Sequence, residues 1–409
     1  MPRITRIASA ILVALVAAAS AEWVAVGPDG GNIQALAPDP QQPATLYALP
    51  YEYPDLPRVF RTTDAGASWS AVGRMNDNYP VSIAVDPHQA NILYATGRTS
   101  VAYRSTDAGA TWSSVILLGT AYYVETDPVV PGRVYMPGYF SSGNTRQALF
   151  VSTDYGATWQ VRSPDTATGT ANSCAADPHN AGTVYLGCSY SRLYKSTDAG
   201  LTWTLANSGL APDLSITAID VNPADSRIVI IAAGTSLYRS LDAGVSWQPA
   251  GTFARVTDVC FSPAAPGTAY ALGYTDSMRF FASSDTGATW TTPPSGLVLN
   301  KGAKLLADPD VGAAAYLATP TGILKTADRG SHWTTAHGGM RLAKVPALAV
   351  PPWDPRSVYL EAAENGVFTS SCGGDTWTRC ADFLSCGAIC GIGVAPASPD
   401  ILWALEGSG

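Results

Sequence analysis

Aspartate is the chemically active residue that recurs most regularly in this 409-residue sequence. Seven copies stand third in an eight-residue box of the form Ser/Thr-x-Asp-x-Gly-x-Ser/Thr-Trp, with His332 replacing the second Ser/Thr in the last of them. These aspartates are Asp64, Asp107, Asp154, Asp198, Asp242, Asp285 and Asp328. An eighth copy carries Cys372 at the Asp position, and successive positions lie 43 to 47 residues apart. This regular spacing indicates a repeat protein.

Other groups that could do chemistry are scattered. The four histidines fall in turns, a box and a linker, away from any Ser or Cys nucleophile in the repeat, so we expect no catalytic triad. Glu52, Asp55 and Asp276 are the carboxylates that would serve a glycoside hydrolase, which needs two of them beside the scissile bond. We predict no catalytic residue, no metal site and no cofactor.

The segments between boxes predict β-strands. In the second repeat, 81–85 and 92–96 are apolar runs on either side of an Asp-Pro turn, and 101–105 and 111–115 flank the box. Four antiparallel strands per roughly 44 residues, with one Trp each, are typical of a β-propeller blade. Nine Asp-Pro-type phrases and eight boxes predict an all-β propeller with eight complete repeats and a partial ninth.

A ring of blades gives the box aspartates a structural role. Equivalent positions lie far apart around one rim, so they cannot converge on a substrate or a metal. We expect each Asp to accept backbone N–H groups in a tight turn and each Gly to adopt positive φ. We expect each Trp to bury its ring against the next blade.

The box resembles the Asp-box, or bacterial neuraminidase repeat. With the Asp-Pro phrase, as in Asp86-Pro87 followed by Ile92–Ala95, it looks like the sortilin, xyloglucanase and photosystem II assembly-factor type of Asp-box propeller. The resemblance covers 22–409 and implies the fold, but this fold hosts enzymes, receptors and scaffolds. The arginine motif of sialidases and the first-blade acid motif of xyloglucanases have no recognisable counterpart here.

The first 21 residues predict a signal peptide: Arg3 and Arg6 precede the apolar run 7–18, and Ala19-Ser20-Ala21 matches a cleavage site. We therefore expect a secreted or periplasmic protein with no transmembrane segment after cleavage, and a propeller over 22–409. The segment 22–26 resembles a lone fourth strand, which predicts either joint closure of a blade by the two ends or a chain truncated at its C-terminus. We favour truncation, because propellers normally close with a complete blade.

The seven cysteines fit export. Cys174 and Cys188 flank one predicted hairpin, and we expect them to form a disulfide. Cys372, Cys380, Cys386 and Cys390 allow three connectivities, and we expect two bridges among them. Zinc binding is the alternative for these four, without a C-x₂-C pair or nearby His to support it. Cys260 is left as a free thiol.

The composition limits the function. With 24 basic and 32 acidic side chains, a formal charge of −8, the chain lacks the basic footprint that a nucleic-acid partner requires. Tyr and Arg, which are enriched in recognition surfaces, recur in the predicted loops between the second and third strands of each blade. The candidate binding residues are Tyr51, Glu52, Tyr53, Arg58, Tyr139, Tyr190, Arg192, Tyr274 and Arg279.

The sequence therefore favours an exported, non-catalytic Asp-box propeller that binds a protein, peptide or glycan through this loop face. The alternative is a sialidase-like or xyloglucanase-like glycoside hydrolase that uses loop carboxylates. An assembly factor for a membrane complex is a third reading, which rests on the family resemblance alone.

Overall fold

The structure, a computed structural model, describes the chain from residue 32 to residue 406 with gaps. The described residues are 32–51, 57–75, 80–97, 99–142, 144–164, 169–190, 192–275, 277–295, 297–299, 303–320, 322–336, 347–349, 358–362, 366–371, 377–381, 389–394 and 402–406. All of their regular secondary structure is β-strand. Accordingly, this part of the chain contains no helix of the length and apolar character that a membrane crossing requires.

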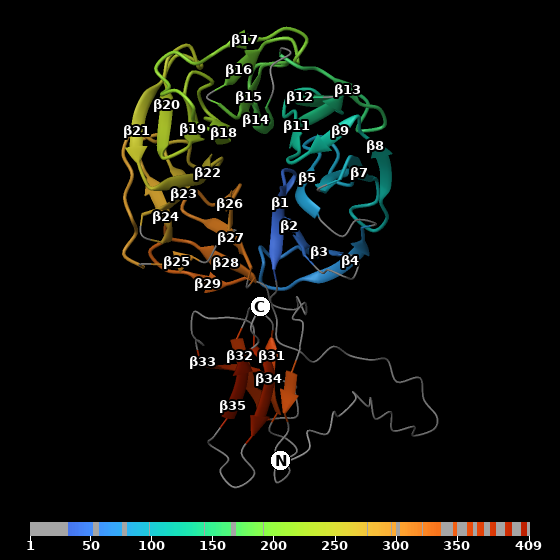
Figure 1. Ribbon diagram of the computed structural model, residues 1–409, viewed down its shortest axis with the longest axis vertical. Helices are drawn as coiled ribbons and strands as arrows, with labels where there is room; N and C mark the ends of the chain where they lie inside the picture. The colour runs from blue at the N-terminus through green and yellow to red at the C-terminus, as the bar shows by residue number, and fades with distance from the viewer. Residues whose placement is uncertain are drawn as a thin grey trace.

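Seven antiparallel sheets form a closed ring of blades (Figure 1). Blade 1 contains β1 (Ile33–Asp39), β2 (Gln42–Pro50), β3 (Arg58–Thr62) and β4 (Ser70–Arg74). Blade 2 contains β5 (Pro80–Val85), β6 (Leu93–Gly97), β7 (Val101–Ser105) and β8 (Ser113–Ile116). Blade 3 contains β9 (Gly119–Ala121), β10 (Glu125–Thr126), β11 (Val134–Ser142), β12 (Asn144–Ser152) and β13 (Gln160–Val161). The strands predicted for the second repeat are thus confirmed.

Blades 4 to 7 repeat this order. Blade 4 contains β14 (Ala171–Ala176), β15 (Val184–Cys188), β16 (Leu193–Ser196) and β17 (Thr204–Leu205). Blade 5 contains β18 (Ile216–Val221), β19 (Val229–Ala233), β20 (Ser236–Ser240) and β21 (Gln248–Thr252). Blade 6 contains β22 (Arg255–Phe261), β23 (Ala269–Tyr274), β24 (Met278–Ser283) and β25 (Val298–Leu299), and blade 7 contains β26 (Lys304–Ala307), β27 (Ala315–Thr319), β28 (Gly322–Thr326) and β29 (Thr334–Thr335). Within a blade, the innermost strand is called strand A and the following strands B, C and D.

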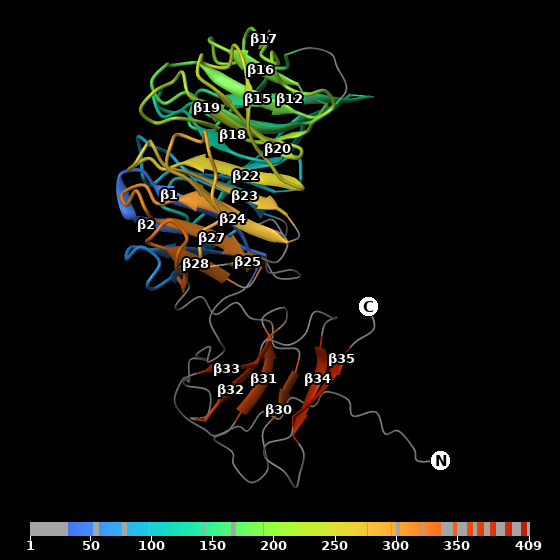
Figure 2. The ribbon, with the colours of Figure 1, turned by 90° about the vertical axis from the view of Figure 1, so that its left-hand side faces the viewer.

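The predicted count of eight complete repeats and a partial ninth in the propeller is wrong, because the ring closes after seven. Two further sheets lie outside it (Figures 1 and 2). One contains β30 (Ala347–Ala349), β31 (Val358–Ala362), β32 (Gly366–Ser370) and β33 (Thr378–Ala381), and the other contains β34 (Ile389–Val394) and β35 (Leu402–Glu406). A repeat specifies its own blade, whereas the number of blades in a ring depends on the angle between neighbours, which the repeat pattern does not contain.

Side-chain contacts close the ring between blades 7 and 1. The indole Nε1 of Trp69 donates to the carbonyl of Ala336 at 2.8 Å, across 267 residues of sequence. The Lys325 ammonium of blade 7 donates to the carbonyl of Ala65 at 3.3 Å. Each of the two blades consists of consecutive strands, so the ring closes without a blade shared by the two chain ends. Residues 22–26, proposed for such a shared blade, lie outside the described residues.

The boxes have the predicted structural role. Asp198 Oδ1 accepts the Thr202 N–H at 2.8 Å, and its Oδ2 accepts the Thr202 hydroxyl at 2.6 Å. The Ser196 hydroxyl donates to Asp198 and accepts the Gly200 N–H at 2.7 Å, where φ is +87°. The Thr202 hydrogen bonds hold the pKa of Asp198 at about 2. The same pattern recurs in the other six boxes.

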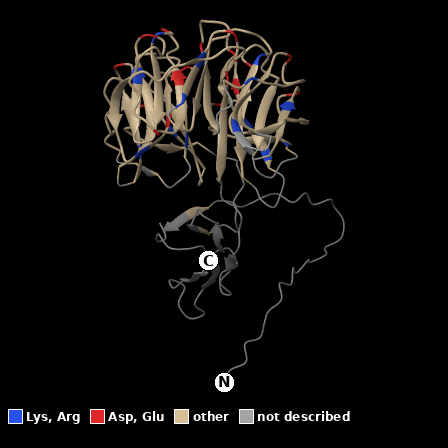
Figure 3. Cartoon of the chain, turned by 45° about the horizontal axis from the view of Figure 1, so that its top comes forward, with Lys and Arg blue, Asp and Glu red and all other residues tan. Residues whose placement is uncertain are grey.

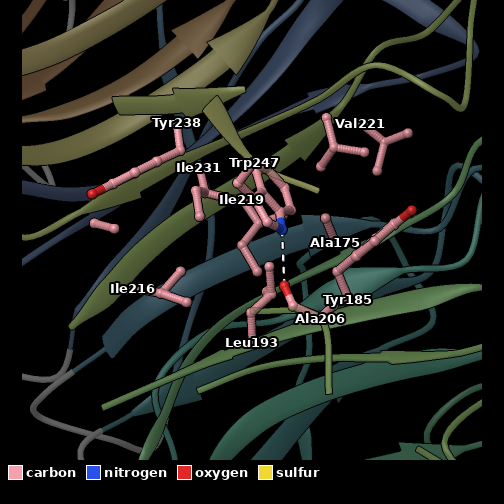
Figure 4. Close-up of a cluster of buried hydrophobic side chains, with 12 residues drawn as sticks. Ala175, Tyr185, Leu193, Ala206, Ile216, Ile219, Val221, Ile231, Tyr238 and Trp247 are labelled. Atoms are coloured by element: carbon pink, nitrogen blue, oxygen red, sulfur yellow. Dashed lines mark hydrogen bonds between the residues drawn. The ribbon is translucent and has the colours of Figure 1, made fainter. Parts of the chain in front are cut away.

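The Trp side chains pack against the preceding blade, and our prediction of the next blade was wrong. Trp247 of blade 5 is 3% exposed, and its Nε1 donates to the carbonyl of Ala206 in blade 4 at 2.8 Å (Figure 4). Trp69 makes the same contact between blades 1 and 7. The sequence places Trp at the start of strand D, but only the orientation of that strand in the ring decides which neighbour the indole meets.

The Asp-Pro phrase closes the turn between strands A and B. Asp86 Oδ1 accepts the N–H groups of His88 and Gln89 at 2.9 and 3.0 Å, and its Oδ2 accepts the Tyr94 hydroxyl at 3.0 Å. Asp127 with Tyr135 and Asp308 with Tyr316 form equivalent pairs. The repeated Asp and Tyr therefore hold adjacent strands together inside a blade.

The predicted Cys174–Cys188 disulfide is absent from the structure, where both residues are buried and form no disulfide. The hairpin places Cys174 opposite Leu186 and Cys188 opposite Ala171, so the two cysteines do not face each other. Cys260 is also a free thiol. Cys372 and Cys386 lie outside the described residues, as do the side chains of Cys380 and Cys390.

Replacing Trp247 with Ala should lower the free energy of unfolding by about 3–5 kcal/mol, because it removes a buried indole between two blades. Urea denaturation followed by circular dichroism would measure the change. The control is Leu201→Ala, at a side chain that is 69% exposed in a box, which should change stability by about 0.5 kcal/mol or less. Equal effects of the two substitutions would contradict the assigned role of the indole.

Candidate functional site

The two faces of the ring differ in sequence character. In an antiparallel meander, the A–B turns and the C–D boxes meet at one face, and the B–C and D–A connections meet at the other. The box face carries the same Asp-containing turns in blade after blade, and acidic turns recur along one rim in Figure 3. We call the opposite face the loop face. Its connections differ from blade to blade, so it is the face that can distinguish ligands.

The predicted binding residues are spread around the loop face rather than gathered in one site. Tyr51 and Arg58 belong to blade 1, Tyr139 to blade 3, Tyr190 and Arg192 to blade 4, and Tyr274 and Arg279 to blade 6. Glu52 and Tyr53 lie outside the described residues, as do the proposed hydrolase carboxylates Asp55 and Asp276.

Several of these side chains belong to strands and contribute to packing. Tyr139 and Tyr274 lie in β11 and β23, because strands B and C of blades 3 and 6 run further than the repeat predicts. Tyr274 packs against the buried cluster between blades 6 and 7. The Arg58 guanidinium lies over the Phe60 ring, 5.4 Å from its centroid. These positions are therefore weaker binding candidates than the sequence indicated.

Tyr190 and Arg192 line one depression on blade 4. Its volume is about 440 Å³, and Asn207, Pro212 and Asp213 from the connection to blade 5 also line it. We call it the blade-4 depression. Of the predicted residues, only this pair is brought together by the structure in a described pocket.

A segment of the loop face with several exposed apolar side chains was missed by the sequence analysis. It runs from Ile116 to Tyr123, between blades 2 and 3, with Leu117 and Gly119–Ala121 buried, and we call it the 116–123 segment. Ile116 is 82% exposed and Leu118 70%, while Tyr122 and Tyr123 are 38% and 40% exposed. Tyr122 also approaches Tyr139, with ring centroids 5.9 Å apart. The detectable signal was an apolar run in a connection, where polar residues would be ordinary.

A polar channel of about 490 Å³ runs through the centre of the ring, lined by the A strands. Glu125 of blade 3, Asp220 of blade 5, Asp258 of blade 6 and Lys304 of blade 7 face it. Asp220 Oδ2 accepts the Phe261 N–H of the next blade at 2.7 Å, and Asp258 Oδ2 accepts the Leu305 N–H at 3.1 Å. These carboxylates therefore connect adjacent blades as well as lining the channel.

The channel raises the pKa of its carboxyl groups. Burial, with the charge of Asp220 adding to it, raises the pKa of Glu125 to about 8. Burial also raises the pKa of Asp220 to about 7, with a further contribution from Asp258. The pKa of Asp258 is raised by burial and partly restored by Lys304. Among the described residues, no group of three or more His, Cys, Asp or Glu side chains has the geometry to hold a metal ion.

Asp220 and Asp258 were missed because each lies within a largely apolar inner strand, as Asp220 does between Ile219 and Val221, and Glu125 was missed because it precedes the Asp-Pro turn at Asp127. A single acid in such a strand is a detectable signal. Its pKa and its role depend on which acids of other blades face it across the channel, and the sequence of one repeat does not contain that information.

The comparisons with known proteins agree with this architecture. Residues 81–259 match the model of a BNR repeat-like domain. An ancestral GH74 enzyme superposes with a TM-score of 0.73 at 18% identity, over 96% of this chain and 60% of that one. A search of curated proteins finds no match.

Smaller propellers are also similar. YCF48 bound to a D1 peptide gives a TM-score of 0.53 at 16% identity, over 73% of this chain and 92% of that one. YCF48 from Cyanidioschyzon merolae gives 0.53 at 19% identity, over 75% and 98% of the two chains. The chain is thus a β-propeller that carries Asp-box repeats, matches a BNR repeat-like domain over 81–259, and is similar in fold to the GH74 enzyme and to YCF48. It spans about 60% of the length of the GH74 enzyme that it matches.

Stability should fall as the pH rises from 5 to 8, by about 1–3 kcal/mol. A carboxyl whose pKa is higher in the folded state contributes stability that is complete below the unfolded pKa of ~4. That stability is lost as the pH rises through the folded values of about 7 for Asp220 and about 8 for Glu125. Urea denaturation at several pH values would measure the slope.

Asp220→Asn should flatten this slope, because the amide does not titrate, although its single oxygen can accept only one of the two N–H groups that Asp220 accepts, from Val221 and Phe261. Asp198→Asn is the matched control, since the pKa of Asp198 is about 2 and lies below the window. A slope unchanged in both Asp220→Asn and Glu125→Gln would show that the channel acids do not cause it.

Proposed function

We propose that this chain is an exported, non-catalytic Asp-box propeller that binds a protein, peptide or glycan through its loop face. The observation that carries the proposal is the 116–123 segment, where Ile116, Leu118, Tyr122 and Tyr123 are exposed and the two tyrosines line the polar channel. Several large apolar side chains exposed within one short segment favour an interaction site. Export rests on the predicted signal peptide.

The contrast between the two faces supports the same conclusion. On the box face, Asp and Ser/Thr side chains are occupied in hydrogen bonds within the turns, as in Asp198 with Thr202. On the loop face, Tyr122 and Tyr123 present partly exposed aromatic rings, and the Tyr123 hydroxyl donates to Glu125 at 3.2 Å. Aromatic side chains of this kind supply contact area and a polar end at low entropic cost. YCF48, which shares the fold, is bound to a D1 peptide in one solved structure.

Leu118→Ser should weaken binding of a ligand selected on a peptide and glycan array by about tenfold, because it removes exposed apolar area from the segment. Leu201→Ser is the matched control: the two leucines are 70% and 69% exposed, but Leu201 lies on the box face. Titration calorimetry with the selected ligand would compare the variants. Equal binding by both variants and the parent would place the ligand elsewhere.

Glycoside hydrolysis is a second candidate function, favoured by the raised pKa of Glu125 and Asp220 in one channel. A hydrolase of this kind needs a carboxylic acid that stays protonated near neutral pH and a second carboxylate. The fold is also that of an ancestral GH74 enzyme. Against this candidate, both Asp220 oxygens already accept backbone N–H groups, from Val221 and Phe261, which assigns the group a structural use.

We therefore expect the parent protein to release no reducing ends from soluble polysaccharides over a range of pH. A reducing-sugar assay would measure this, with Glu125→Gln as the partner variant. Hydrolysis by the parent that is abolished in Glu125→Gln, while the melting curve stays the same, would establish the enzyme instead.

A further inference from the structure

The blade-4 depression is lined by two non-glycine residues with left-handed backbone, of which Tyr190 is the strained one, because Asp adopts this conformation more readily. Outside the seven boxes, Tyr190 and Asp213 are the non-glycine residues of the described chain with positive φ, at 61° and 58°. Both line this depression. In the boxes, the residue after each Asp adopts positive φ for a structural reason that recurs seven times. Tyr190 and Asp213 lie outside the repeated box, so this structural reason does not apply to them. Residues with strained backbone often cluster at binding sites.

Tyr190 is held in this conformation with its side chain outward. The Cys188 N–H donates to the Arg192 carbonyl at 2.8 Å, and the Ser189 N–H donates to the Thr170 carbonyl at 3.0 Å, which fixes the turn on both sides. The Tyr190 side chain is 66% exposed, so burial does little to offset the cost of left-handed backbone in a residue other than glycine. A tyrosine here is best explained by a use for its ring.

The lining of the depression is fixed by hydrogen bonds within blade 4 and to both neighbouring blades. Asn207 Oδ1 accepts the Leu193 N–H at 2.9 Å, and the Trp247 N–H of blade 5 donates to the Ser208 carbonyl at 2.8 Å. The Gln147 amide of blade 3 donates to the hydroxyl of Tyr194, which also lines the depression, at 3.2 Å. The depression is therefore preformed, which lowers the ordering cost of binding.

The charges of the lining select the chemistry of the ligand. Arg192 and Asp213 contribute one positive and one negative group, so the depression has no net charge to attract an anion or a cation. The ring of Tyr190 and the side chain of Pro212 offer apolar surface, while Arg192, Asp213 and Asn207 bear donors and acceptors. A neutral ring with one apolar face and several hydroxyl groups satisfies both kinds of surface.

We propose that the blade-4 depression binds a sugar ring of a neutral glycan, with one face of the sugar on Tyr190 and its hydroxyl groups on Arg192 and Asp213. This inference rests on the proposed loop-face binding function and names its ligand class. A peptide is the competing occupant and is an outcome of the test below.

The test uses the full chain and five hexamer probes: cellohexaose, xylohexaose, maltohexaose, hexagalacturonate and a mixed-sequence peptide. Titration calorimetry should detect at least one neutral hexasaccharide, and its affinity should change less than twofold between 0.05 and 0.5 M NaCl, because no net charge is neutralised. Preferential binding of hexagalacturonate or the peptide, or strong dependence on salt, would overturn the inference.

Tyr190→Gly separates binding from folding. Glycine accepts positive φ without strain, so the melting temperature should equal or exceed that of the parent, while affinity for the neutral hexasaccharide should fall at least tenfold. Asp213→Asn tolerates the same backbone and keeps an oxygen acceptor, and it should retain affinity within about threefold. Loss of binding in Asp213→Asn alone would indicate a cationic ligand and contradict the proposal.

Tyr122→Ala is the control on the same face, and it should leave hexasaccharide affinity unchanged. If Tyr122→Ala abolishes binding and Tyr190→Gly does not, the glycan belongs to the 116–123 segment, so the present inference fails while the proposed function stands. If none of the five probes binds, the inference fails, and the array experiment with Leu118→Ser decides the proposed function separately.

Discussion

The inner edge of each blade is the constraint on which the ring depends. A four-stranded meander pairs its strands with one another but leaves the N–H groups on one side of strand A without a partner strand. Side chains of the preceding blade accept several of these groups. Asp220 accepts from Phe261, Asp258 accepts from Leu305, and Ser82 accepts from Val124 at 3.2 Å. An isolated blade cannot provide these acceptors. The ring therefore stabilises each blade by accepting hydrogen bonds from the N–H groups of its strand A.

The same coupling operates between the faces of adjacent blades through the box tryptophans. Trp247 inserts between blades 5 and 4, in a cluster that includes Tyr185, Leu193 and Ile219 (Figure 4). The box and the Asp-Pro turn keep strands in register within a blade, and the indole joins that blade to its neighbour. Because the box and the Asp-Pro turn recur on the same face from blade to blade, the sequence of that face varies little. Variation is left to the loop face, where the connection before Tyr122 and the turn at Tyr190 differ from their counterparts in other blades.

The carboxylates that line the channel connect adjacent blades and also carry ionisable groups with raised pKa values. A serine at an inner-edge position, as at Ser82, accepts an N–H without carrying a charge. Asp220 makes a similar contact with a carboxyl group whose pKa burial raises to about 7. A buried charge of this kind opposes folding at high pH, so its presence invites a functional explanation. The two backbone hydrogen bonds that Asp220 accepts supply a structural explanation. The bond from Phe261 in the next blade is sufficient to account for the position of Asp220.

The sequence by itself determined the blade. The third strand of blade 2, at 101–105, and the hydrogen-bonded roles of Asp198 and Gly200 could be predicted because they depend on partners two to four residues away. For Tyr190, the sequence predicted a position in a loop but did not predict its positive φ. Local hydrogen bonds and apolar periodicity are written into short segments, and a repeat multiplies that signal.

Tertiary structure alone decided the rest. Closure after seven blades depends on the small rotation between each pair of neighbours, summed around the ring, and on contacts such as Trp69 with Ala336, which are 267 residues apart. The direction of the Trp side chains, the offset between Cys174 and Cys188, and the meeting of Glu125 with Asp220 in one channel follow from that geometry. None of these has a local energetic signature. Each exists because distant segments share one closed surface.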